Sequence, residues 1–389
     1  MWFQFLNFFN LFALLLILIY YLRNLARTPK EEFEFELSPL LCEELVEEIL
    51  SRLPVKSLVR FSCVSKSWEY LISDSRFIKL HFDRSSSTVN ADFAHARFIT
   101  LCDVHDYHRS YVSSRSITSI LENHHSTPSC LVGSSFTGAC NGLISLKYET
   151  ANGSLVCFWN PATRSISQLS PGLICHGYFG FGYDSLSDTF KVVNVNPQET
   201  MMYIYNMGDK CWRTIQVSPL PRMRFVQPAV YVRNTINWLS SQPMDINPFK
   251  IASFDLGKQK FAQLSLPFCP GDLDQFHFLP TPGVLRGCLC ISENNYATNN
   301  FAVWQMKEFG VHESWTQLFS ISGSESLIQM PCSAMSISDN GDALLLSVSA
   351  AFQGTIYTFR DNKLQGMKIA KEIGGCYTEN YIESLVSPC

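Results

Sequence analysis

Histidine and aspartate side chains gather in one short stretch and are of the types that bind metal ions. His105 and His108 lie beside Asp103 and Asp106, and the pair His124-His125 follows further along the chain. A protein zinc site needs three or four ligands that converge on one point, and a second layer of hydrogen bonds that orients them. Nothing in this spacing makes the side chains converge. We therefore interpret them as exposed loop residues and expect no metal and no cofactor.

Two other patterns are of the kinds that carry catalysis or bind phosphate. Cys140 and His176 are a candidate nucleophile and base, and Gly177, Gly180 and Gly182 are a candidate phosphate-binding loop. Cysteine is among the residues most often buried, and Cys140 lies where a strand runs into a turn. A phosphate-binding loop leads into a helix, and no helical pattern follows these glycines. We expect strand and turn structure here and no catalytic residue.

The composition is that of a globular and mostly apolar chain. Of its 389 residues, 46% are hydrophobic and 16% are charged, and the net charge is −4 without a basic stripe. Nucleic-acid binding needs such a stripe, so that function is disfavoured. The 14 cysteines are scattered and include no Cys-x-x-Cys pair. This favours reduced thiols in the cytoplasm or nucleus.

Residues 1–30 form an apolar segment of their own. The stretch Trp2–Leu22 carries no charge, and Arg23, Arg27 and Lys30 follow it. As a helix the stretch would span about 32 Å, enough to cross a membrane, and its basic flank would keep the rest of the chain on the cytosolic face. The segment is therefore a predicted membrane anchor. A cleaved signal peptide and a wrong first exon are the alternatives.

Residues 37–82 have the pattern of a small helical module. In the first helix apolar residues recur every four positions, acidic residues occupy the other face, and Pro54 ends it. Two short helices are expected over 56–63 and 65–72. A module this small has a marginal core, so part of its apolar surface is expected to meet a partner. Packing against the remaining chain is the alternative.

A polar linker over 83–94 is predicted to lead into a large all-β domain over 95–387. The sequence of this domain repeats at intervals of 45 to 54 residues. Four strands in a repeat of that length are typical of a propeller blade. We therefore predict an all-β propeller-like domain of about six blades, preceded by the small all-α module and the apolar N-terminal helix. Two packed β-sandwiches are the alternative. The repeated strand–turn–strand units start at Phe158, Tyr203, Ile251, Phe301 and Thr355, at intervals of 45, 48, 50 and 54 residues, with a looser copy at Phe98.

The helical module resembles a plant-type F-box over ILSRLPVKSLVRF, CVSKSW and LISDSRFIKLH. It differs from that family at Leu41-Cys42, where the family has Leu-Pro and this chain has its proline at Pro39. The resemblance implies docking to a Skp-family adaptor, which bridges to a cullin and a RING protein. Carried over by position, the docking residues would be Leu45, Ile49, Leu50, Leu53, Pro54, Leu58, Val64 and Trp68.

The large domain resembles the plant F-box-associated interaction domain over GACNGLISL, WNPATR, GFGYDSLSDTFKVV and the terminal YIESLVSP. The resemblance implies a propeller-like domain that recruits a protein substrate of unknown identity for ubiquitination. Tryptophans near the hairpins, such as Trp238, are expected to pack between blades. Interfaces are enriched in arginine, methionine and aromatic residues, so two loops are candidate substrate contacts. These are Arg222, Met223, Arg224 and Phe225, and the loop over 243–249.

Together these patterns predict a non-catalytic substrate-recognition subunit of an SCF-type (Skp-cullin-F-box) ubiquitin ligase, related to the F-box/kelch-repeat proteins. One alternative is a membrane-anchored β-propeller scaffold without ligase coupling. The other is an enzyme such as a propeller hydrolase, which would need converging carboxylates or a metal. The predicted location is the cytoplasm or nucleus, or the cytosolic face of a membrane if Trp2–Leu22 is an anchor.

Overall fold

The computed structural model divides the chain into two compact units, with the boundary between His81 and Phe82. The predicted anchor within residues 1–30 lies outside the described residues. Among the helices that are described, none is long and apolar enough to cross a membrane. The structure describes residues 43–91, 97–104, 109–116, 129–130, 134–174, 177–196, 201–216, 224–225, 229–241, 249–268, 279–295, 300–322, 332–337, 343–348, 353–360, 363–371 and 377–388.

Short helices joined by tight turns make up the described part of the first unit. The side-chain oxygen of Ser65 accepts a hydrogen bond from Trp68 N at 3.2 Å, and Asp74 Oδ1 accepts one from Arg76 N at 2.9 Å. These bonds satisfy backbone donors at the helix starts, which would otherwise have no partner. The helices are α2 (Glu43–Leu50), α3 (Val55–Phe61), α4 (Lys66–Ser73) and α5 (Ser75–Ala91), and α5 crosses the unit boundary.

One predicted boundary is wrong, and another is as expected. Helix α2 ends at Leu50, before Pro54, in agreement with the prediction that this proline stops the helix. The chain there forms a tighter turn, in which Leu53 N donates to Leu50 O at 3.0 Å. The expected linker over 83–94 is helical as far as Ala91. Ser86 Oγ donates to Phe82 O of the preceding helical turn at 2.7 Å.

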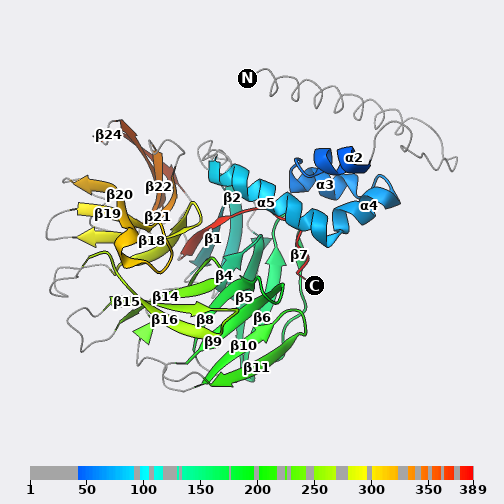
Figure 1. The fold of residues 1–389 in the computed structure, drawn as a ribbon, viewed down its shortest axis with the longest axis horizontal. Coiled ribbons are helices and arrows are strands. Elements are labelled where there is room, and N and C mark those ends of the chain that lie inside the picture. The colour runs from blue at the N-terminus through cyan, green and yellow to red at the C-terminus, as the bar shows by residue number, and fades with distance from the viewer. Residues whose placement is uncertain are drawn as a thin grey trace. The chain divides into compact units, whose positions relative to one another are not determined.

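The described strands of the second unit form six antiparallel sheets (Figure 1). The first four, here called sheets I to IV in order around the domain, hold strands β1 to β16 and the last strand, β25. Sheet I is β25 (Tyr377–Tyr381), β1 (Arg97–Val104), β2 (Arg109–Ser116) and β3 (Ser129–Cys130). Sheet II is β4 (Ser134–Cys140), β5 (Leu143–Thr150), β6 (Gly153–Asn160) and β7 (Ser165–Ile166). Sheet III is β8 (Tyr178–Asp184), β9 (Thr189–Val195), β10 (Met201–Asn206) and β11 (Cys211–Gln216). Sheet IV is β12 (Arg224–Phe225), β13 (Val230–Val232), β14 (Thr235–Ser241), β15 (Phe249–Asp255) and β16 (Lys260–Ser265).

The remaining two sheets complete the set. Sheet V is β17 (Thr281–Leu285), β18 (Cys288–Asn295), β19 (Asn300–Met306) and β20 (Trp315–Ser322). Sheet VI is β21 (Cys332–Ile337), β22 (Ala343–Val348), β23 (Gln353–Arg360) and β24 (Lys363–Lys371). The number of sheets agrees with the prediction of about six repeats.

The sheets follow one another around a common centre. The first strand of each sheet contacts the first strand of the next, through β25, β4, β8, β13, β17 and β21 and back to β25. The last strand of the chain, β25, which is red in Figure 1, pairs with β1. In this pairing Tyr381 lies opposite Arg97. This pairing joins the two ends of the domain within one sheet, the usual way to leave no exposed sheet edge in a propeller. The domain is propeller-like, as predicted.

The sequence repeat corresponds to one strand of each sheet. Phe158, Tyr203, Ile251, Phe301 and Thr355 all lie in the third strand of sheets II to VI. The looser copy at Phe98 differs from the other five by one strand. Phe98 lies in β1, which is the second strand of sheet I and not the third. The register differs because the first strand of that sheet, β25, comes from the other end of the chain.

Several residues of the propeller motifs hold the domain together. Asn160 is fully buried, and its Nδ2 donates to Ser384 O at 2.9 Å and Val386 O at 2.8 Å. Gly142 has a φ of +80°, and a Cβ there would lie 2.1 Å from Ser384 Oγ, so only glycine fits. Trp238 is also fully buried and donates from sheet IV to Phe179 O of sheet III at 3.3 Å. The prediction that tryptophans pack between blades is confirmed for Trp238.

Candidate docking surface on the helical unit

Helix α2 exposes one of its two apolar ridges. Leu45 and Ile49, four residues apart, lie on one side of the helix; Leu45 is 39% exposed and Ile49 is half-buried. Leu50 is 1% exposed and belongs to the ridge that faces inward. An ion pair between Glu48 and Arg52 lies on the surface at the end of the helix. The exposed ridge is therefore the part of α2 that is free to contact a partner.

The turn after α2 is fixed by hydrogen bonds from two directions. Ser51 Oγ donates to Glu48 O at 2.9 Å, and His81 Nε2 lies 2.9 Å from Leu53 O. Pro54 is exposed, with φ −60° and ψ 146°, at the N-cap position of α3. Proline has this φ already fixed by its ring, so the start of α3 costs little conformational entropy. Leu53 and Pro54 are thereby held in one conformation before any partner arrives.

Helix α3 has a buried side and an exposed side. Val55 and Leu58 are buried, at 1% and 0% exposure. Lys56, Val59 and Arg60 lie on the exposed side, and Val59 is 39% exposed. Val59 is absent from the docking residues predicted by resemblance. The spacing Lys56, Val59, Arg60 at positions i, i+3 and i+4 is the signal in the sequence that would have placed it on one helix face.

The segment from α3 to α4 separates a surface valine from a core tryptophan. Val64, in the turn between the helices, is 39% exposed. Trp68 is buried, and its ring meets that of Phe61 edge-on with the centroids 5.6 Å apart. An edge-to-face pair is a favourable aromatic geometry in a core. Trp68 therefore supports the module from inside.

The charged groups around α4 are engaged locally. Lys66 Nζ lies 2.7 Å from Glu69 Oε2, and the hydrogen bond to that carboxylate raises the pKa of Lys66. The backbone N–H of Arg76 donates to Asp74, and this bond is the main cause of the lowered pKa of the Asp74 carboxyl. Both groups are charged at neutral pH. Lys66 forms an ion pair on the surface of α4, and Asp74 caps the start of α5.

Burial divides the predicted docking residues into two groups. Some lie at the surface and could touch an adaptor directly; others are buried and could act only by supporting the module. The surface group is Leu45, Pro54 and Val64, with Ile49 and Leu53 half-buried, and the buried group is Leu50, Leu58 and Trp68.

The predicted substrate contacts on the large domain are in part wrong. Phe225 is only 4% exposed; its ring lies 5.1 Å from that of Tyr178 and 5.4 Å from that of Trp238. It is a core residue because it fills the space between sheets III and IV, where aromatic side chains bury the most area. Phe249, at the end of the second loop, is buried as well. Arg224 lies in β12, and its backbone pairs with Ser241. Arg222 and Met223 lie outside the described residues, as does the loop over 243–248.

The candidates for other chemistry are placed as follows. Cys140 is buried, and His176, His105, His108 and the pair His124-His125 lie outside the described residues. Gly180 and Gly182 lie within β8, where a Cβ would collide with Trp238 and Tyr231 of sheet IV. They permit close packing of two sheets rather than a phosphate loop. In the part of the chain that the structure describes, no group of three or more His, Cys, Asp or Glu could hold a metal ion.

The fold defines a class of protein in which a small helical unit precedes a propeller-like domain. Two family matches give this class a name. Residues 39–80 match the F-box domain, and residues 93–388 match the F-box associated beta propeller domain. The chain belongs to the family of plant F-box proteins that carry this propeller domain.

Named relatives agree with this assignment. The chain is 28% identical to F-box/kelch-repeat protein At3g23880 of Arabidopsis thaliana, over 93% of this chain and 98% of the relative. It is also 28% identical to F-box protein CPR1 of Arabidopsis thaliana, over 73% of each chain. Among solved structures, TolB from Acinetobacter baumannii aligns over 79% of this chain and 73% of its own, with 11% identity and a TM-score of 0.47. That structural likeness is too weak to support an argument about function.

Proposed function

We propose that this protein is the substrate-recognition subunit of an SCF-type E3 ubiquitin ligase. The helical unit would dock to a Skp-family adaptor, which links to a cullin and a RING protein, and the propeller would hold a target protein. The observation that carries the proposal is the F-box match over 39–80 together with exposed apolar side chains at Leu45, Val59 and Val64. A small module with exposed apolar groups gains stability by covering them with a partner.

The proposed mechanism is proximity rather than chemistry by this chain. Tethering the target near a bound conjugating enzyme raises the effective concentration of its lysines at the reactive thioester. The propeller, for which we propose one closed ring of six blades, supplies a rigid platform, and this is supported by the contacts between neighbouring first strands. The chain needs no catalytic residue for this role. We propose that it acts in the cytoplasm or nucleus.

A pull-down of the full-length chain with a purified Skp-family adaptor tests the docking role. We expect Leu45→Asp and Val64→Asp to weaken adaptor binding by about tenfold or more, because each places a charge in an apolar contact. The Leu53→Ala/Pro54→Ala double variant should also bind more weakly. Tyr70→Asp is the matched control, because Tyr70 is 78% exposed on the same unit and is not among the predicted contacts.

Two results would contradict the proposal. If the wild-type chain does not bind the adaptor, a propeller scaffold without ligase coupling becomes the better account. If the wild type binds and the Leu45→Asp and Val64→Asp variants bind equally well, the adaptor uses a surface that does not include Leu45 and Val64.

A further inference from the structure

The turns on one face of the propeller share a single construction. In sheets II, III and IV an Asx side chain accepts a backbone N–H two residues ahead, at 2.8 to 3.0 Å. The residue four positions after each Asx has a positive φ of 51° to 59°. Turns of this kind are rigid, because side chain and backbone fix the same loop. The Asx residues are Asn160, Asp184, Asn206 and Asp255, and the residues with positive φ are Arg164, Asp188, Lys210 and Gln259.

These turns also share one edge of the sheets. In an antiparallel sheet the turn between strands one and two lies at the same end as the turn between strands three and four. The short turns at 185–188, 207–210, 233–234, 256–259 and 286–287 therefore lie on the same face of the domain. We call it the turn face.

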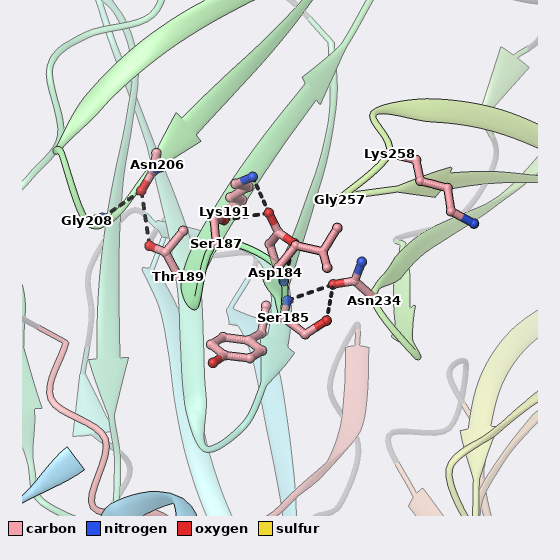
Figure 2. Close-up of polar contacts among 12 residues, drawn as sticks. Asp184, Ser185, Ser187, Thr189, Lys191, Asn206, Gly208, Asn234, Gly257 and Lys258 are labelled. Carbon is pink, nitrogen blue, oxygen red and sulfur yellow. Dashed lines mark hydrogen bonds and ion pairs between the residues drawn. The ribbon is translucent and has the colours of Figure 1, made fainter. Parts of the chain in front are cut away.

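Hydrogen bonds lock two neighbouring sheets together on the turn face. Ser185 N donates to Asn234 Oδ1 at 2.9 Å, which joins the first turns of sheets III and IV (Figure 2). Below them the buried ion pair of Lys191 and Asp184 anchors the same turn, and Asp184 Oδ1 accepts Leu186 N at 3.0 Å. The backbone at Leu186 is therefore held in place by both sheets.

An exposed leucine stands on this rigid base. Leu186 is 76% exposed, yet its side chain lies against the turn of sheet IV, where a Cβ on Gly257 would come within 2.6 Å of Leu186 Cδ1. A single exposed leucine is common on protein surfaces, but the backbone that carries this one is held by both sheets. A fixed backbone reduces the conformational entropy that is lost when the side chain inserts into a partner.

Two cations belong to the sheet IV turns that contact the turn of this leucine. Arg233 precedes Asn234 and Lys258 follows Gly257, so both belong to the turns that touch the 185–186 turn, and both are exposed. Arg233 forms no ion pair with any described residue, and Lys258 Nζ is 3.7 Å from the nearest oxygen of Asp255, with its side chain 76% exposed. Figure 2 shows Lys258 extending away from the turns. We call Leu186, Arg233 and Lys258 the turn patch.

The acids of the same turns are engaged within the chain. Asp188 accepts a hydrogen bond from Tyr183, and Asp255 Oδ1 accepts those of Gly257 N at 3.0 Å and Lys258 N at 2.8 Å. Asp188 is exposed, but both carboxylates are held by hydrogen bonds within the chain, whereas Arg233 is exposed and has no ion-pair partner among the described residues. In sheet V the turn over 307–314 carries Glu308 and Glu313 as well as Lys307, whereas the sheet IV turns at 233–234 and 256–259 carry Arg233 and Lys258 and no acid.

We propose that the turn patch is the contact site for the target protein and binds a segment in which an apolar side chain is flanked by carboxylates. The inference rests on the proposed function, because it names the class of target segment that the propeller holds. The complement to an exposed leucine whose neighbouring turns carry two cations is an apolar group accompanied by anions. A protein segment is favoured over nucleic acid, since the turn patch offers an aliphatic contact and no aromatic ring for base stacking.

Selection from a random library of short linear peptides, displayed on phage and applied to the immobilised full-length chain, tests this inference. We expect enriched peptides to place an apolar residue among several Asp or Glu residues. Arg233→Glu/Lys258→Glu and Leu186→Ser should each weaken the binding of the enriched peptides by about tenfold, measured by fluorescence anisotropy. Arg164→Glu/Lys307→Glu makes the same charge change at exposed turn residues of sheets II and V and should leave peptide binding unchanged.

Thermal unfolding of each variant checks that the propeller is intact, and Arg233→Ala/Lys258→Ala is a milder second pair with the same expected direction. The inference is overturned if no peptide is enriched, if the enriched peptides lack acidic residues, or if the variants bind them as the wild type does. It is also overturned if a single-stranded RNA binds more tightly than the peptides and loses binding in Arg233→Glu/Lys258→Glu. No adaptor is present in this assay, so its failure is distinguishable from a failure of adaptor docking.

Discussion

In the helical unit the residues Leu45, Val59 and Val64 are each 39% exposed, whereas in the propeller-like domain the motif residue Asn160 and the hairpin residue Trp238 are fully buried. The difference follows from size. A module of fewer than about fifty residues cannot enclose all of its apolar side chains, but a domain of several hundred residues can. The F-box motif therefore includes exposed candidate contact residues, while buried motif residues such as Asn160 are scaffold. In the propeller, candidate contacts are to be sought on the exposed turns, such as 185–188 within the motif GFGYDSLSDTFKVV.

The largest effect is expected from breaking the scaffold of the propeller. Asp184→Ala leaves the buried ammonium of Lys191 without its carboxylate, and should lower the free energy of unfolding by about 3–5 kcal/mol. Thermal and urea unfolding would measure the loss. Asp184→Leu/Lys191→Met removes both charges and should recover most of the stability. A loss below 1 kcal/mol for Asp184→Ala, on the order of a surface pair, would show that this pair is not structural.

The same pair gives a pH dependence. Burial alone would raise the pKa of Asp184, but hydrogen bonds from Lys191, Ser187 and Leu186 outweigh it and hold the pKa below the usual value. A carboxyl whose pKa is lowered by folding stabilises the protein above its unfolded pKa, about 4, and loses that contribution as pH falls through the folded value. Acid unfolding of the wild type should therefore be steeper than that of the uncharged double variant.

Two neighbouring residues of α3 sharpen the contrast within the helical unit. Leu58→Ala should lower stability by about 2–5 kcal/mol, because it leaves a cavity at a fully buried position. Val59→Ala should change stability by less than about 0.5 kcal/mol but weaken adaptor binding, since Val59 is a surface residue. Unfolding and adaptor affinity are measured on both variants. If Val59→Ala leaves affinity intact, the exposed side of α3 is outside the docking surface.

The anchoring of the C-terminal segment is the next test of the scaffold. Asn160→Ala removes the donor to Ser384 O and Val386 O and the acceptor for Ala162 N, and should cost about 1–3 kcal/mol. Limited proteolysis would detect release of the segment at 382–388. Asn152→Ala, in an exposed turn of the same sheet, is the control and should be close to neutral. Equal protease resistance in both variants would contradict the anchoring role.

The smallest effect is expected at a buried acid of sheet V. Burial raises the pKa of Glu293, while the hydrogen bond from Trp304 Nε1 at 3.1 Å opposes the shift. A carboxyl with a raised pKa costs stability once the pH rises above its unfolded value, about 4, because the ionised form is disfavoured in the folded state. Glu293→Gln should therefore raise the melting temperature slightly at neutral pH and not below that value. A lower melting temperature of the variant at neutral pH would contradict this, because it would mean that a neighbouring group stabilises the ionised carboxylate of Glu293 in the folded state.

Most helix boundaries of the helical unit can be predicted from the sequence, because they depend on residues that are close together in the chain. Apolar spacing, Pro54 and the capping residues Ser65 and Asp74 fix where helices start and stop. The exception is the extension of α5 to Ala91, where a serine-rich stretch looks like a linker. Serine has a modest helix propensity, and a helix already begun at Ser75 can continue through it, since propagation is easier than nucleation.

The sequence by itself determined the class of the fold, the repeat length and the family motifs, because strand alternation and turn residues are local signals. Only the tertiary structure decided which motif residues are surface and which are core. In the structure Trp68 and Leu58 are buried, and Phe225 is buried and therefore not a surface contact. The structure also shows that Ser185 lies beside Asn234, which is distant in the sequence. Burial depends on which strands from distant parts of the chain become neighbours. That pairing is set by the packing of whole sheets, which no local pattern encodes.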